Sequence, residues 1–99
     1  MRLTLEQVRV IREKVQAAFG AGARVYLFGS RRDDTARGGD VDLYVEVPHF
    51  VENRAAAASR LTAELQLAFG DQHIDILMAD PNTRRQPIHE MAKAKGIPL

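Results

Sequence analysis

Three aspartates stand in positions where that residue type is unusual, because aspartate is disfavoured inside β-strands. Asp40 and Asp42 open the alternating run DVDLYVEV, and Asp75 lies inside the apolar run IDIL. A spacing of two places Asp40 and Asp42 on the same side of one strand, about 7 Å apart. If the strand around Asp75 lies beside it, all three carboxylates converge on one point.

Such a cluster of carboxylates is electrostatically unfavourable unless cations or protons offset its charge. Three ionised carboxylates about 5 Å apart repel by roughly 3 kcal/mol per pair at an effective dielectric constant near 20. The cluster therefore needs cations or shifted pKa values. Mg²⁺ takes hard oxygen ligands, and two such ions hold the attacking and leaving oxygens of an in-line displacement. The competing explanation, for two aspartates alone, is the solvated face of a half-buried strand.

A phosphate-binding element stands upstream of these aspartates. Gly29 and Ser30 follow the apolar run VYLF and precede a polar stretch that we expect to start with a short helical turn. Glycine lets a phosphate approach the backbone, and amides at a helix start bind it together with a serine hydroxyl. Arg31 would neutralise phosphate charge, although a solvated loop explains it as well. His73 could face the same site, although a surface strand histidine explains it too.

The rest of the chain supplies the elements that would hold these residues. Thr4 and Gln7 form a capping box, and Leu5, Val8, Ile11, Val15 and Phe19 give the following helix one apolar face. Apolar periodicity and glycine or proline stops predict helices over residues 5–19, 51–69 and 87–95, and strands over residues 24–28, 40–47 and 72–78. We expect the first two strands to be antiparallel and the third, reached over a long helix, to be parallel to the second.

This order predicts an α/β (α+β) fold with a small mixed three-stranded sheet and helices packed mainly on one face. Tyr44 shares the aspartates' face and is expected to be half-exposed.

The 99 residues indicate a single domain, 1–99. A net charge of +1 gives no support for nucleic-acid binding, no apolar run could span a membrane, and the absence of cysteine excludes a thiol nucleophile. We expect a cytoplasmic protein.

The motifs together resemble a known signature. The run LFGS is followed, after nine residues, by DVDL. These two motifs at this spacing are similar to the signature of the DNA polymerase beta-type nucleotidyltransferase superfamily, and IDI resembles its third-aspartate strand. The short spacing resembles the minimal branch, the MNT domains of MNT–HEPN toxin–antitoxin pairs. The acidic pair Asp33 and Asp34, after Arg31 and Arg32, departs from the basic and small residues that often follow glycine and serine in this family.

The resemblance implies roles for the motif residues. Gly29 and Ser30, with Arg31, would bind the phosphates of ATP, and Asp40, Asp42 and Asp75 would bind two Mg²⁺ ions as the catalytic residues. An acceptor hydroxyl would attack the α-phosphorus and pyrophosphate would leave. The implied acceptor is a tyrosine of a partner HEPN-domain protein, neutralised by AMP transfer in a hetero-oligomer. The alternative is a non-catalytic antitoxin that neutralises its partner by binding alone.

Overall fold

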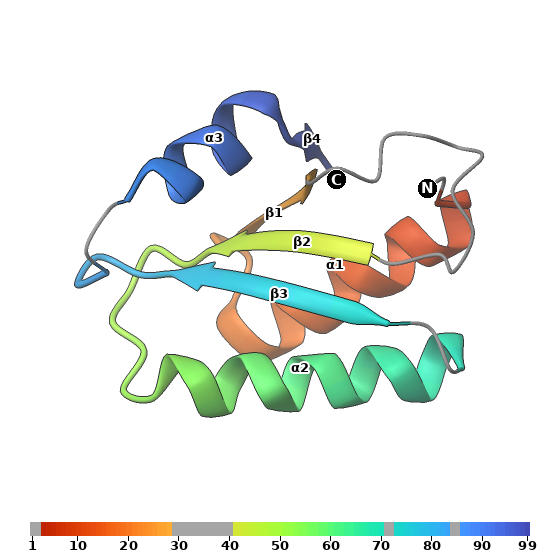
Figure 1. The fold of residues 1–99 in the computed structure, drawn as a ribbon. Helices are drawn as coiled ribbons and strands as arrows, with labels where there is room; N and C mark the ends of the chain where they lie inside the picture. Colours follow the sequence, from red (N-terminus) through yellow and green to blue (C-terminus); the bar gives the residue numbers. More distant parts are fainter. Residues whose placement is uncertain (1–2, 29–40, 71–72, 84–85) are drawn as a thin grey trace.

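The computed structural model describes residues 3–28, 41–70, 73–83 and 86–99 (Figure 1). The predicted short helical turn and loop over residues 31–39 therefore lie outside the described residues. The elements, in chain order, are α1 (Leu5–Phe19), β1 (Arg24–Phe28), β2 (Val41–Glu46), α2 (Arg54–Phe69), β3 (Ile74–Ala79), α3 (Pro87–Lys95) and β4 (Ile97–Pro98).

The strands form one mixed sheet in the order β3-β2-β1-β4, which confirms the predicted α+β class. β1 pairs antiparallel with β2, and β2 pairs parallel with β3, both as predicted. α2 makes the connection between the parallel strands, as a crossover helix must.

The prediction of three strands is wrong by one, because the chain turns back after α3 and pairs Ile97 with Leu27. A two-residue strand carries no alternation that a sequence pattern could reveal. Gly96 permits this return: a Cβ there would lie 2.3 Å from the Ala92 carbonyl oxygen and 2.9 Å from the Tyr26 Cβ.

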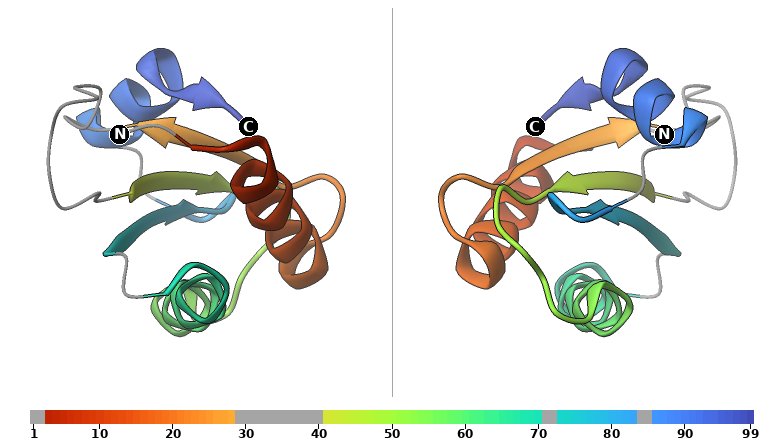
Figure 2. Two further views of the ribbon diagram at one scale, coloured as in Figure 1. Left: turned by 90° about the vertical axis from the view of Figure 1, so that its right-hand side faces the viewer. Right: turned by 90° about the vertical axis from the view of Figure 1, so that its left-hand side faces the viewer.

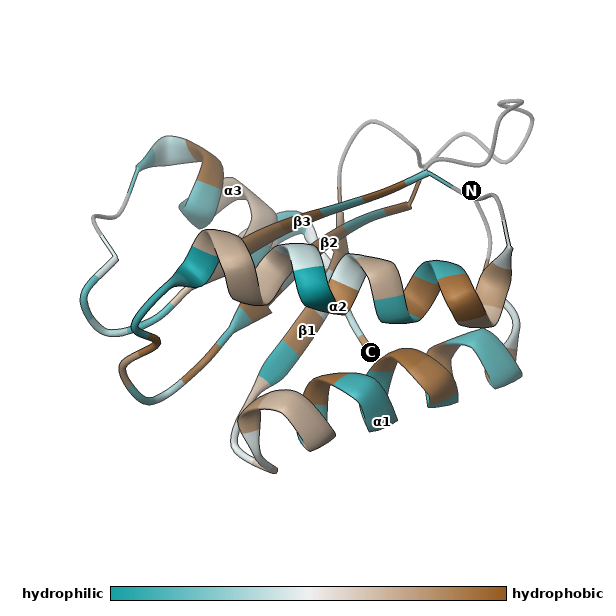
Figure 3. Cartoon of the chain, turned by 90° about the horizontal axis from the view of Figure 1, so that it is seen from below, coloured by the Kyte–Doolittle hydropathy of each residue, from teal (hydrophilic) through white to brown (hydrophobic). Residues whose placement is uncertain are grey.

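Helices cover both faces of the sheet: α1 and α2 lie on the first face and α3 lies on the other (Figures 1 and 2). α1 and α2 lie side by side across the first face (Figure 3), where the fully buried Val41, Leu43 and Val45 meet Ile11 and the rest of the core. α3 covers the opposite face. None of the helices in the described ranges is both long and apolar enough to cross a bilayer.

The helix boundaries follow local capping chemistry. The Thr4–Gln7 capping box is present, and Gly20 ends α1 with a positive φ of 92°. α2 begins at Arg54 rather than near residue 51, because the Asn53 side chain accepts a hydrogen bond from the Ala56 N–H. The predicted apolar face of α1 is wrong at Leu5, which is 90% exposed.

The expected exposure of Tyr44 is also wrong. It is fully buried rather than half-exposed, because α3 packs directly over it. Its ring centroid lies 5.8 Å from that of Tyr26 and 6.2 Å from that of His89, and its hydroxyl donates to Glu46 Oε2 at 3.3 Å. The aspartates' side of the sheet is therefore solvated only where α3 does not cover it.

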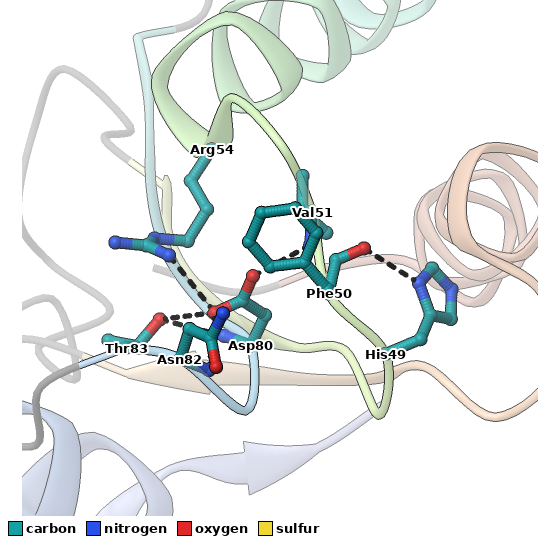
Figure 4. A network of polar contacts seen from close by, with 7 residues as sticks. All are labelled: His49, Phe50, Val51, Arg54, Asp80, Asn82 and Thr83. Carbon is teal, nitrogen blue, oxygen red and sulfur yellow. Dashed lines mark hydrogen bonds and ion pairs between the residues drawn. The ribbon is translucent and has the colours of Figure 1, made fainter.

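A buried carboxylate fixes the loops at the C-terminal ends of β2 and β3 (Figure 4). Asp80 is 2% exposed and accepts hydrogen bonds from the Val51 N–H at 2.7 Å, the Asn82 N–H at 3.0 Å and the Thr83 hydroxyl at 3.1 Å. Arg54 Nη1 lies 3.0 Å from the same carboxylate. The Val51 N–H contributes most to lowering the pKa of Asp80; burial opposes this, and Thr83, Asn82 and Arg54 assist it.

His49 holds the neighbouring turn against the end of α1. Its Nε2 lies 2.9 Å from the Phe19 carbonyl oxygen. Its Nδ1 lies 3.3 Å from the Phe50 carbonyl oxygen (Figure 4). Protonated histidine donates from both nitrogens. The Phe19 carbonyl, first, and the Phe50 carbonyl raise the pKa of His49 for this reason.

Replacing Asp80 with Asn should lower the Tm at pH 7 on the order of 10 °C, because buried N–H and hydroxyl donors lose an ionised acceptor. The lowered pKa means that the carboxylate's contribution is complete above pH 3.8 and is lost as the pH falls through the lower folded-state value. Thermal unfolding followed by circular dichroism at pH 7 and pH 3 should therefore show a gap that narrows in acid. Glu52→Gln, an exposed carboxyl of the same loop, is the control; equal Tm values for both variants at pH 7 would contradict the prediction.

Candidate functional site

Of the predicted site residues, the structure describes Asp42 and Asp75. Asp40, Gly29, Ser30 and Arg31 lie outside the described residues. The chain leaves the described part at Phe28 and re-enters it at Val41. Phe28 is the register partner of Asp42, so both described ends of this segment lie next to that aspartate.

The sheet register brings Asp42 and Asp75 together. They are direct partners in the parallel pairing of β2 and β3. Partners in neighbouring strands project from the same face, and the strands lie about 4.8 Å apart. Because Val41 and Leu43 face the core under α1 and α2, Asp42 projects from the other face, and Asp75 with it. The strand adjacency predicted from the sequence is therefore present.

Both carboxylates are accessible to a ligand. Asp42 is half-buried, and the side chain of Asp75 is 64% exposed. His73 lies on the same side of the chain as Asp75, with its Nε2 3.5 Å from Asp75 Oδ1. The pair stands at the starts of β2 and β3, and Glu46 and Ala79 occupy the other ends of these strands.

The chemistry of this pair suits a hard cation. Two carboxylates about 5 Å apart repel by about 1 kcal/mol in water and by roughly 3 kcal/mol at an effective dielectric constant of 20. Magnesium binds through one or two carboxylates together with water and phosphate oxygens. Within the described ranges no three His, Cys, Asp or Glu side chains gather as a metal site, so the pair would hold an ion only together with other ligands.

A cavity of about 200 Å³ lies elsewhere, between α1, β1 and the last residues of the chain. Arg12 and Gln16 of α1 and Leu99 are among its lining residues. Neither aspartate lines this cavity.

The surroundings of the pair include one residue to which the sequence gave no role at the site. Phe28 is partly buried beside Asp42 on the face that α3 covers. Its place directly before Gly29 was the available signal, but nothing in the sequence states which face of the sheet the last helix covers.

Replacing Asp42 with Asn should leave the metal-free domain as stable as the parent or up to about 1 kcal/mol more stable, because the repulsion from Asp75 disappears. Urea unfolding with a chelator measures this difference in the free energy of unfolding. Added Mg²⁺ should stabilise the parent more than the variant. A loss of several kcal/mol without metal would instead mean that Asp42 has a structural role.

The comparisons with known proteins place this arrangement in a family. A family model described as a nucleotidyltransferase domain matches residues 8–95, a range that begins within α1 and includes β2, β3 and all of α3. A search of the curated proteins and a search of the solved structures gave no match. Since the family model covers most of the chain and contains the strands that pair the two aspartates, the chain belongs to the nucleotidyltransferase domain family.

Proposed function

We propose that the domain transfers AMP from ATP to a hydroxyl group, with Mg²⁺ bound by Asp42 and Asp75 together with Asp40. The observation that carries the proposal is the direct pairing of Asp42 with Asp75 across β2 and β3 in a chain of the nucleotidyltransferase family. Adjacent carboxylates at the same end of two paired strands supply the hard oxygen ligands that Mg²⁺ prefers.

In the proposed reaction, residues of this chain bind the triphosphate and accept the proton of the acceptor hydroxyl. Gly29, Ser30 and Arg31 would bind the triphosphate, since the segment that contains them begins directly after Phe28, beside Asp42. The acceptor oxygen forms a bond to the α-phosphorus while the bond from that phosphorus to the β-phosphate's bridging oxygen breaks, and pyrophosphate leaves. The hydroxyl proton passes to the carboxylate of Asp75. Bound metal would supply charge stabilisation for the phosphoryl oxygens.

The acceptor that we propose is a tyrosine hydroxyl of a HEPN-domain partner protein, which AMP transfer would neutralise. The support is the similarity of the LFGS, DVDL and IDI motifs and their spacing to minimal nucleotidyltransferases of toxin–antitoxin pairs. The binding-only alternative makes a different prediction for the same complex, because it needs neither nucleotide nor metal.

With a co-expressed HEPN partner, label from α-³²P ATP should enter the partner when Mg²⁺ is present, whereas label from γ-³²P ATP should not. Asp42→Asn and Asp75→Asn should each reduce the rate by on the order of a hundredfold or more, since charge stabilisation at the reacting phosphorus is lost. Glu64→Gln, on α2 under the opposite face of the sheet, is the matched carboxylate control. Neutralisation of the partner without any label, by parent and variants equally, would overturn the catalytic proposal in favour of binding alone.

A further inference from the structure

His73 lies next to the carboxylate pair, directly before β3. Its carbonyl oxygen accepts the Val41 N–H at 2.9 Å, and this bond joins the starts of β2 and β3. Val41 directly precedes Asp42, so the backbone of His73 is bound to the segment that carries the first aspartate of the pair. The strand pairing that brings Asp42 and Asp75 together therefore also holds His73 in place.

The imidazole of His73 is directed at Asp75. Residues two apart in an extended chain project from the same face, and here the Nε2 of His73 lies 3.5 Å from Asp75 Oδ1. An ionised carboxylate only accepts hydrogen bonds, so the ring nitrogen that faces it acts as a donor. The distance exceeds the roughly 2.7–3.2 Å of a normal hydrogen bond. Such contacts at a reaction site are often long without substrate and shorten when it binds.

A carboxylate that binds a metal ion is sensitive to a donor of this kind. The side chains of Asp75 and His73 are 64% and 61% exposed, so packing does not fix the orientation of the carboxylate. A donor at Oδ1 sets the plane of the carboxylate and with it the direction of Oδ2. Loss of an outer hydrogen-bond partner typically weakens metal binding by about 10–100-fold.

We propose that His73 is a positioning residue for Asp75: its Nε2–H holds Oδ1 and leaves Oδ2 to bind the metal ion. This inference rests on the proposed function, because it assumes that Asp75 binds Mg²⁺. His73 itself contacts neither the ion nor the nucleotide in this arrangement. An ion pair as exposed as this one adds little to folding stability, so the effect of His73 should fall on metal binding rather than on the fold.

The first test separates the Nε2 donor from the rest of the ring. Glutamine carries its amide N–H groups close to the position of histidine Nε2, whereas the shorter asparagine carries them close to that of Nδ1. Mn²⁺ binding to the full chain, with a non-hydrolysable ATP analogue present, can be followed by water-proton relaxation. His73→Ala and His73→Asn should each raise the Kd for Mn²⁺ by about tenfold, and His73→Gln should stay within about threefold of the parent. Circular dichroism should show the same fold for all three variants.

The second test asks whether His73 acts through Asp75. Asp75→Ala removes both carboxylate oxygens and keeps Asp42. In that background His73→Ala should change the Kd for Mn²⁺ by less than about twofold, because no carboxylate remains for His73 to orient. The pair of residues should thus show nearly complete coupling in a double-mutant cycle.

Each contrary result has its own meaning. A parental Kd in His73→Ala, or a Kd in His73→Gln as weak as that in His73→Ala, would overturn the inference. An equal loss from His73→Ala with and without the Asp75 carboxylate would mean that His73 contacts the ion or the nucleotide itself, and the inference would be wrong. If Asp75→Ala weakens Mn²⁺ binding and His73→Ala does not, the proposed function stands and only the role of His73 fails. Absence of Mn²⁺ binding by the parent chain with the analogue would refute the proposed function, and the inference with it.

Discussion

The parallel, in-register pairing of β2 with β3 is the constraint on which the site depends. It places Asp42 directly beside Asp75, and a slip of one residue would turn one of these carboxylates into the apolar core. The alternation of both strands prevents such a slip, because Leu43 and Ile76 must remain on the side of α1 and α2. The repulsion between the aspartates is thus maintained by hydrophobic burial on the other face of the sheet.

Other elements keep that register in place. α2 spans the sheet between the two strands, and its first residue, Arg54, contacts the buried carboxylate of Asp80 at the end of β3. The same carboxylate accepts the Val51 N–H from the chain that leaves β2. The C-terminal ends of β2 and β3 are therefore fixed by polar contacts, whereas their starts carry the accessible aspartates. The loops held by Asp80 and the accessible aspartates therefore lie at opposite ends of the same pair of strands. A binding site on a small scaffold needs such rigid support.

Much of this arrangement could be predicted because local signals were strong. Alternation identified β2, the capping box fixed the start of α1, and Pro87 with Gly96 bracketed α3. The placement of α3 could not be predicted, since a tyrosine such as Tyr44 suits both a solvated and a buried strand face. For that reason the sequence did not predict the burial of Tyr44. The adjacency of Asp42 and Asp75 was predictable from strand order, while their joint role in catalysis remains a prediction.

The claim that Asp42 and Asp75 share one cation can be tested by a double-mutant cycle on Mn²⁺ affinity, measured by electron paramagnetic resonance with ATP present. If both carboxylates bind the same ion, Asp42→Asn and Asp75→Asn should each cause most of the loss seen in the double variant, with a coupling energy of at least about 1 kcal/mol. Strictly additive losses, or single variants that retain the parent affinity, would show that the two side chains do not act on one ion and would contradict the account.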